Sequence, residues 1–256
     1  MIDLKQGDCL EVMKEIPSGS IDLILCDLPY GVTKNKWDFV IPLNHLWEQY
    51  ERIIKERGAI VLTAQDKFSA KLMLSNEKLH KYNLIWDKQL TSGFLNANRM
   101  PLRVHEDILI FYKKLSTYNP QKTEGKSSHS KGKMITDKNN NYGKYGKVDN
   151  KDVLGSMKHP KSIISFQKPH PSKALHPTEK PLKLFEWLIK TYSNENDLVL
   201  DNCMGSGTTG VACKNLNRDF IGIELDEKYF DIAKKRIESS EKQINLKEER
   251  DDYYGK

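Results

Sequence analysis

Residues 21–31 read IDLILCDLPYG, an apolar run that ends abruptly in an acid, a Leu-Pro step, a tyrosine and a glycine. The apolar run has the length and composition of a buried strand. Pro and Gly end strands in many proteins and Asp is a common turn residue, so the segment taken alone predicts a turn. The alternative is that Asp27 and Tyr30 stand at the end of a strand to bind or react with a ligand. Other parts of the sequence decide between these two interpretations.

Short apolar runs alternate with helical periodicities on both sides of a polar middle. Strands are expected at 2–4, 21–26, 59–64, 84–87 and 107–112, and helices at 43–55 and 67–75. After residue 180, helices are expected at 182–192, 208–215 and 227–238, and strands at 198–200 and 220–224. This alternation predicts a parallel or mixed sheet covered by helices.

The middle of the chain is basic and poor in aliphatic residues. Residues 113–175 hold 14 Lys and 4 acidic residues, a balance of +10, so the rest of the chain carries −4 of the total +6. Such asymmetry is typical of a nucleic-acid binder, although a solvated lysine-rich loop gives the same count. The segment 114–170 is expected to be loop, small irregular domain or partly disordered, with one short strand at SIISF (162–166).

Length and cysteine usage narrow the class of protein. The 256 residues fit one large domain or a core with an insertion. Four cysteines occur without a CxxC pair or a Cys/His pattern at zinc-ligand spacing, so no metal site is expected. The start MIDLKQGD lacks the features of a signal peptide, and no apolar run approaches membrane-spanning length. We therefore expect a cytoplasmic protein that does not enter a membrane.

A glycine-rich turn follows the expected strand at 198–200. It reads DNCMGSGTTGVAC (201–213), with glycines at 205, 207 and 210 before a helix. A P-loop is excluded because no Lys stands at its position, and G-x-G-x-x-G alone is as compatible with close packing as with a dinucleotide. Glu224 ends the next strand, 17 residues after Gly207, where an acid can bind ribose hydroxyls. Asp201 disfavours a diphosphate beside it, which favours S-adenosylmethionine over NAD.

Four segments together resemble the S-adenosylmethionine-dependent amino DNA methyltransferases, which act on adenine N6 or cytosine N4. They are D-x-P-Y-G (27–31), D-x-x-x-G-S-G-T-T (201–209), HPTEKP (176–181) and GDCLEVM (7–13). The D-x-P-Y-G element precedes the basic segment and the glycine loop follows it. This order resembles the circularly permuted β-class of the family.

The resemblance implies an α/β, Rossmann-like methyltransferase fold. It implies a mixed seven-stranded sheet of order 3-2-1-4-5-7-6, with strand 7 antiparallel, helices on both faces and an inserted target-recognition region. Residues 1–113 would form the catalytic half, 114–170 the target-recognition insert and 171–256 the cofactor-binding half. Strands 1 and 4 of this order are neighbours, so Asp27 and Asp201 are expected to open side by side.

The resemblance also implies the site residues. In the D-L-P-Y segment, the Asp27 carboxylate and the Leu28 backbone carbonyl would accept hydrogen bonds from the target amine. Pro29 would shape the turn. Tyr30 would stack on a base flipped out of double-stranded DNA. The expected cofactor-binding residues are Asp8, Thr178, Lys180, Asp201, Cys203, Met204, Gly205, Ser206, Gly207, Thr208, Thr209 and Glu224. The first letter, Asp27, favours adenine over cytosine as the target.

Two departures from the family pattern and several alternatives stay open. Leu28 stands where proline is usual, and Asn202-Cys203 stands where Pro-Phe is commoner, so Cys203 or Met204 would fill the space of an aromatic ring. Methylation at cytosine C5 is disfavoured because no Pro-Cys pair occurs. An RNA or protein methyltransferase, an inactive DNA-binding module and an NAD-dependent oxidoreductase are the alternatives. The sequence does not decide between a monomer and a homodimer, or whether a partner restriction nuclease exists.

Overall fold

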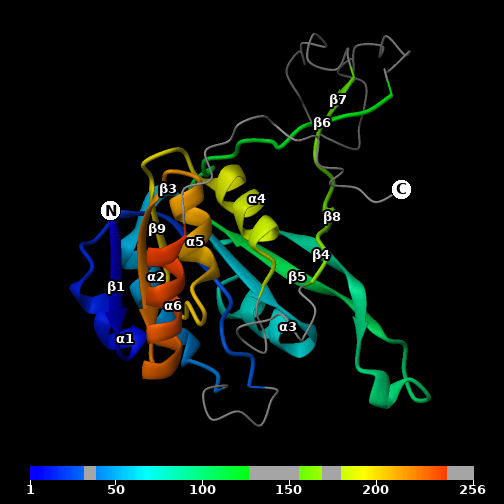
Figure 1. Cartoon of the computed structure of the whole chain (residues 1–256), viewed down its shortest axis with the longest axis horizontal. Coiled ribbons are helices and arrows are strands. Elements are labelled where there is room, and N and C mark those ends of the chain that lie inside the picture. The colour runs from blue at the N-terminus through cyan, green and yellow to red at the C-terminus, as the bar shows by residue number, and fades with distance from the viewer. Residues whose placement is uncertain (32–38, 127–155, 169–179, 241–256) are drawn as a thin grey trace. The chain divides into compact units, whose positions relative to one another are not determined.

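A computed structural model describes residues 1–31, 39–126, 156–168 and 180–240 (Figure 1). The described chain divides into two compact units, one of residues 1–119 with 162 onward, the other of residues 120–161. In the second unit, β6 (Thr123–Glu124) pairs antiparallel with β7 (Met157–Lys158). All other elements belong to the first unit.

The first unit is built on an eight-stranded sheet of order β1-β10-β9-β2-β3-β5-β4-β8. Its strands are β1 (Ile2–Gln6), β2 (Ile21–Cys26), β3 (Ile54–Ala64), β4 (His80–Ser92), β5 (Arg103–Phe111), β8 (Ile163–Ser165), β9 (Leu198–Asp201) and β10 (Asp219–Glu224). Among the described strands of this sheet, only β5 runs antiparallel to its neighbours β3 and β4. The first seven strands in this order reproduce the expected order 3-2-1-4-5-7-6, which is confirmed.

The expected strand count was one short. The strand expected at 162–166 forms as β8 and joins the sheet edge in parallel with β4, pairing Trp86 with Ile164. The chain therefore carries an eighth strand in the same sheet. The expected elements are otherwise present with shifted ends, and the largest shift is in β4, which runs from His80 to Ser92 rather than over four residues.

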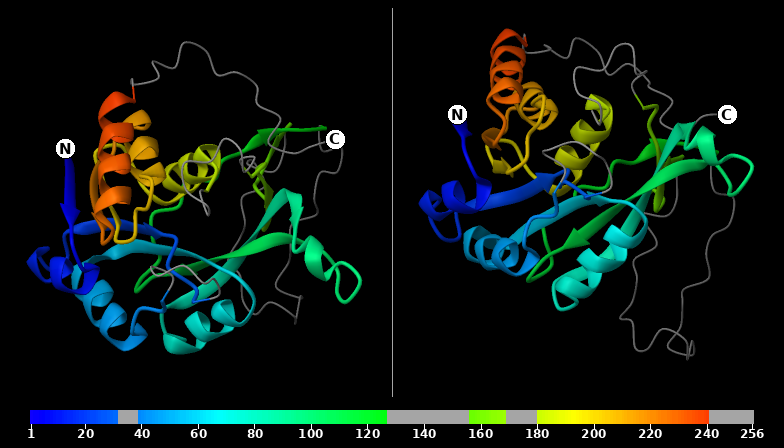
Figure 2. Two further views of the ribbon diagram at one scale, coloured as in Figure 1. Left: turned by 60° about the horizontal axis from the view of Figure 1, so that its bottom comes forward. Right: turned by 90° about the horizontal axis from the view of Figure 1, so that it is seen from below.

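Helices cover both faces of the sheet, which explains why the buried stretches of its central strands, such as 23–26 and 59–64, are mostly apolar. On one face lie α4 (Leu182–Tyr192), α5 (Thr208–Asn215) and α6 (Glu227–Ser239); on the other lie α1 (Cys9–Val12), α2 (Leu43–Ile53) and α3 (Asp66–Ser75) (Figure 2). In β2, Leu23 and Leu25 enter the first core and Ile24 and Cys26 the second. A strand buried on both faces needs a continuous apolar run such as the one at 23–26.

Among the described residues, no helix is long and apolar enough to cross a bilayer.

Candidate active site

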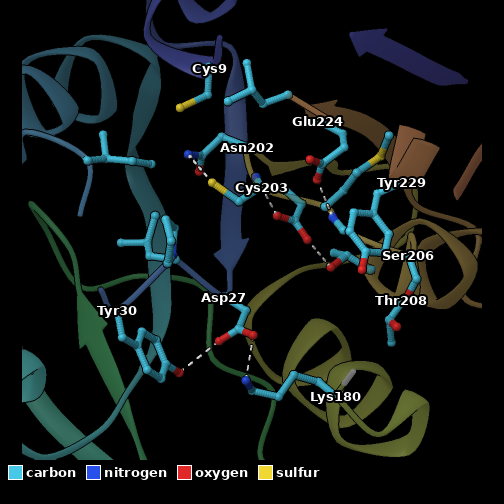
Figure 3. A pocket seen from close by; sticks show the side chains of 18 of the residues that line it. Cys9, Asp27, Tyr30, Lys180, Asn202, Cys203, Ser206, Thr208, Glu224 and Tyr229 are labelled. Atoms are coloured by element: carbon cyan, nitrogen blue, oxygen red, sulfur yellow. Dashed lines mark hydrogen bonds and ion pairs between the residues drawn. The ribbon is translucent and has the colours of Figure 1, made fainter. Parts of the chain in front are cut away.

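The two motifs open at the same edge of the sheet. β2 and β9 are parallel neighbours, with Leu23 beside Val199 and Ile24 beside Leu200. Asp27 and the Asp201 loop follow the carboxyl ends of these two strands and therefore lie next to each other. This is the point where the strand order reverses, and open α/β sheets bind ligands there. A cavity of about 320 Å³ lies there, a size suited to a nucleoside-sized ligand (Figure 3).

Asp201 organises the glycine loop from within. Its carboxylate is 3 % exposed and accepts hydrogen bonds from the Cys203 N–H at 3.1 Å and from the Thr209 hydroxyl. These bonds join the end of β9 to the first turn of α5. Burial raises the pKa of Asp201 to about 7, although the hydrogen bonds act to lower it. The Asp201 carboxylate therefore takes up a proton near neutral pH.

Two further acids lie at the cavity wall on the strand ends beyond β9. Glu224, at the end of β10, accepts the Gly205 N–H at 2.8 Å and the Asp226 N–H at 2.9 Å. Burial raises the pKa of Glu224. Asp8 caps α1 by accepting the Leu10 N–H at 2.8 Å. Each carboxylate is thus held in place by backbone groups.

The other expected cofactor residues are placed in three ways. Cys203, Met204, Gly205, Ser206, Thr208, Thr209 and Lys180 line the cavity together with Asp8, Asp201 and Glu224. Gly207 is not among the lining residues: with φ +79° it starts α5, and a Cβ there would stand 3.0 Å from both Ala233 Cβ and Ile237 Cδ1 of α6. It therefore serves the turn and the packing of α6. Thr178 lies outside the described residues.

The departures from the family pattern have structural counterparts. The Leu28 side chain, 3 % exposed, packs into the core that α2 and α3 cover, so the residue that replaces proline contributes to the core. Asn202 accepts a hydrogen bond from the Tyr50 hydroxyl at 2.5 Å. Tyr229 of α6, which sequence reasoning missed, adds an aromatic ring to the cavity wall near Glu224 (Figure 3).

Asp27, which also lines the cavity, is the centre of a network of polar contacts. Its Oδ1 accepts hydrogen bonds from the Tyr30 hydroxyl at 2.8 Å and from Thr63, and its Oδ2 lies 2.6 Å from the Lys180 Nζ. The Tyr30 ring stacks on Phe68, with centroids 5.1 Å apart and planes at 30°. Burial raises the pKa of Tyr30, and the charge of Asp27 raises it further, so the phenol stays a donor to Asp27.

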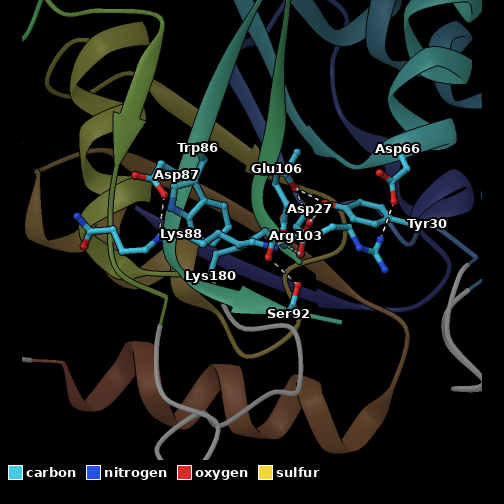
Figure 4. A network of polar contacts seen from close by, with 12 residues as sticks. Asp27, Tyr30, Asp66, Trp86, Asp87, Lys88, Ser92, Arg103, Glu106 and Lys180 are labelled. Atoms are coloured by element: carbon cyan, nitrogen blue, oxygen red, sulfur yellow. Dashed lines mark hydrogen bonds and ion pairs between the residues drawn. The ribbon is translucent and has the colours of Figure 1, made fainter. Parts of the chain in front are cut away.

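Behind Asp27 lies a buried cluster of charges that the sequence did not reveal (Figure 4). Lys180 is 3.4 Å from Glu106 Oε2, and Lys88 is 3.2 Å from Glu106 Oε1. Glu106 and Lys88 stand on β5 and β4 and are 8 % and 2 % exposed. Although burial opposes its ionisation, the ammonium groups of Lys180 and Lys88 hold the pKa of Glu106 below its ordinary value. Burial lowers the pKa of Lys180 and the carboxylates of Asp27 and Glu106 raise it, with a net rise.

The chain is similar in sequence and in fold to known proteins. A family model described as DNA methylase covers residues 21–235. The chain belongs to this DNA methylase family. It is 29 % identical to the type II methyltransferase M.HpaI of Haemophilus parainfluenzae, over 91 % of this chain and 73 % of the relative. It is 27 % identical to the DNA adenine methyltransferase YhdJ of Escherichia coli, over 91 % and 81 %. The crystal structure of an M1.HpyAVI–SAM complex superimposes with a TM-score of 0.62 at 29 % identity, over 92 % of this chain and 100 % of that one.

The cavity of this DNA methylase fits S-adenosylmethionine. Its wall at the ends of β1 and β10 carries the acids Asp8 and Glu224, which suit the amino and hydroxyl donors of a nucleoside. The lysines among the lining residues are Lys88, Lys168 and Lys180, and Lys88 and Lys180 belong to the charge cluster behind Asp27. Among the described residues that line the cavity, a diphosphate placed against the Asp201 loop would therefore face carboxylates instead of lysines. Among the described residues no group of His, Cys, Asp and Glu is placed to hold a metal ion.

Proposed function

We propose that this DNA methylase transfers a methyl group from S-adenosylmethionine to the N6 amine of an adenine flipped out of double-stranded DNA. The observation that carries the proposal is that Asp27 lines the same cavity as the glycine loop and Glu224. A base atom inside a duplex cannot reach such a cavity, so the base has to leave the stack. When bound, S-adenosylmethionine supplies an electrophilic methyl group on a sulfonium.

The role proposed for Asp27 and Leu28 follows from the electronic structure of the target. An exocyclic amine on an aromatic ring is a poor nucleophile because its lone pair is delocalised. Hydrogen bonds from the amine to the Asp27 carboxylate and the Leu28 carbonyl favour a pyramidal nitrogen and localise the lone pair on it. The carboxylate also stabilises the positive charge that the nitrogen gains, and fixed charges of this kind act strongly in a site that excludes water.

The role proposed for Tyr30 is to hold the flipped base. Its hydroxyl is fixed on Asp27 and one face of its ring rests on Phe68. A rigid aromatic ring beside the acceptor supports stacking of the base, which contributes about 1–3 kcal/mol per base in single-strand binders. Glu224, Asp8, Gly205 and Tyr229 are proposed to bind the nucleoside part of the cofactor.

Adenine is preferred over cytosine on two grounds. Asp27 opens the D-L-P-Y segment, as in the adenine form of the family motif, and YhdJ, whose description names adenine as its target, is similar over most of the chain. Cytosine N4 is the second candidate. The basic segment 114–170 is proposed to contact DNA, where its lysines would bind phosphates. A homodimer and a role in restriction–modification stay hypotheses of this proposal.

The test is methyl transfer from tritiated S-adenosylmethionine to duplex DNA by wild type, Asp27→Ala and Asp27→Asn. Loss of a preorganised charged group in an active site costs about 10²–10³ in rate, and we expect at least that loss in both variants. Asp231→Asn, on the exposed side of α6, is the matched control and is expected to keep wild-type activity. Full activity of the folded Asp27→Ala protein would overturn the assigned chemistry.

A further inference from the structure

The Lys180 ammonium is bonded to the Asp27 carboxylate, the group proposed to accept hydrogen bonds from the target amine. Its Nζ lies 2.6 Å from Asp27 Oδ2, and the side chain is 7 % exposed. On Oδ1 the same carboxylate is already bonded by Tyr30 and Thr63. In the base-free protein Asp27 therefore has donors on both oxygens, and an incoming amine competes with them.

Charge makes this competition matter for the reaction. Methyl transfer places positive charge on the amine nitrogen, and a neighbouring carboxylate stabilises it. An ammonium held on the same carboxylate offsets that stabilisation and repels the new cation, most strongly in a site shielded from water. Lys180 in its present position thus opposes the step that Asp27 promotes.

A second acceptor for Lys180 stands beside the first. Glu106 Oε2 is buried, lies 3.4 Å from the Lys180 Nζ, and has no hydrogen-bond partner among the described residues, while Oε1 is used by Lys88 (Figure 4). An approach of about 0.6 Å would bring Lys180 to the usual length, about 2.8 Å, of a hydrogen bond between charged groups. A buried carboxylate oxygen without a donor costs free energy, so Glu106 has reason to accept the ammonium.

We propose that Lys180 is a placeholder for the target amine: it holds Asp27 in the base-free enzyme and passes to Glu106 when the base enters. Glu106 is then a positioning residue, which acts on the reaction through Lys180. The proposal rests on the proposed function, because it needs Asp27 to bind the target amine. It adds that a cation leaves Asp27 before methyl transfer and that Glu106 receives it.

The test compares a single variant with a charge-balanced double variant. Lys88→Met removes one buried cation and keeps Glu106; Lys88→Met/Glu106→Gln removes one buried cation and one buried anion, leaving Lys180 with Asp27 alone. Single-turnover methyl transfer is measured at saturating DNA and S-adenosylmethionine, and DNA affinity is measured separately. We expect the double variant to be about 10-fold slower than Lys88→Met, the effect of one charge-assisted hydrogen bond. DNA affinity should stay within about twofold, because phosphate contacts dominate it.

Adding Lys180→Met to the double variant separates the proposal from a merely structural role. With no ammonium left to compete, the transfer rate is expected to recover at least part of the loss. Equal rates in Lys88→Met and the double variant, or a loss that Lys180→Met does not relieve, would overturn the proposal. If the double variant does not fold, Glu106→Asp carries the test: its shorter side chain withdraws the carboxylate from Lys180, and an unchanged rate overturns the proposal. Failure of Asp27→Ala to lose activity would instead contradict the proposed function.

Discussion

Asp27 and Lys180 are 153 positions apart in the chain, and their side chains meet at 2.6 Å. Asp27 follows β2, and Lys180 stands two residues before α4, on the far side of the basic segment. The permuted strand order makes this contact, because it sets the N-terminal strand β2 beside the C-terminal strand β9. One site is thus assembled from both halves of the chain.

Thr63→Val is expected to slow methyl transfer about 10-fold, the effect of one lost hydrogen bond to a charged group. The Thr63 hydroxyl donates a hydrogen bond to Asp27 Oδ1 and accepts one from the Tyr30 hydroxyl at 3.1 Å. Because Thr63 is buried at the end of β3, it holds the carboxylate in place. Thr63→Ser keeps the hydroxyl and is the matched control, with a rate expected close to wild type. Single-turnover kinetics measure both. A wild-type rate in Thr63→Val would show that the orientation of Asp27 does not depend on Thr63.

Asp201 makes stability depend on pH. Its folded-state pKa of about 7 lies above the ordinary value of 3.8, so between these values the folded protein binds a proton that the unfolded chain has lost. The contribution of Asp201 is fully present below pH 3.8 and is lost as pH rises to about 7. This difference in pKa between the unfolded and folded states corresponds to about 4 kcal/mol of unfolding free energy.

Asp201→Asn removes this titration while its amide can still accept the Cys203 N–H and donate to the Thr209 hydroxyl. Urea unfolding of the cofactor-free protein at pH 5 and pH 8 measures the effect. We expect the wild-type free energy of unfolding to fall across this interval by more than that of Asp201→Asn. The same fall in both proteins would assign the pH dependence to other groups.

Gly210→Ala is expected to destabilise the fold by about 1–3 kcal/mol, the usual cost of overpacking. A Cβ at Gly210 would stand 2.4 Å from Ile237 Cδ1 and 2.8 Å from Phe220 Cε1, although alanine is the better helix former within α5. Ile237→Val removes the nearest of these atoms. Urea unfolding of the double variant should therefore show part of the loss recovered, and no recovery would place the strain elsewhere.

Lysines of the basic segment are expected to set the salt dependence of DNA binding. Each phosphate contact contributes about 0.9 to the slope of log affinity against log salt concentration. Replacing three of these lysines with Gln should lower the slope by up to about 3 without changing the affinity for S-adenosylmethionine. The variant is Lys131→Gln, Lys133→Gln and Lys138→Gln.

The matched control replaces three exposed lysines of α6, Lys228, Lys234 and Lys235, with Gln. Its slope should equal that of wild type. If the control loses as much slope as the first variant, net charge explains the effect, and the basic segment has no special role in binding.

The central strands, the glycine loop and the pairing of the two motifs could be predicted because local pattern determines them. An apolar run such as 23–26 forms part of a strand buried on both faces. Asp27 directly follows the end of β2, and Glu224 is the last residue of β10. Glu106 and Lys88 could not be found this way. They are polar residues within strands near the sheet edge, and their burial depends on contacts with Lys180, far along the chain.

The role of Gly207 was equally beyond a one-dimensional pattern. The G-x-G-x-x-G spacing predicts a ligand-binding turn, yet the space that Gly207 leaves open faces Ala233 and Ile237 of α6. The same holds for Asp201, whose hydrogen bonds serve the loop itself. For Gly207, the packing of α5 against α6 decides what the motif residue contacts.

The measurement that tests the account most directly is identification of the methylated nucleoside. Duplex DNA is incubated with the protein and tritiated S-adenosylmethionine, digested to nucleosides, and the labelled nucleoside is separated and identified by mass. We predict label in N6-methyldeoxyadenosine alone, and none when Asp27 is replaced by alanine. Label in N4-methyldeoxycytidine or 5-methyldeoxycytidine, or no label in DNA, would contradict the account.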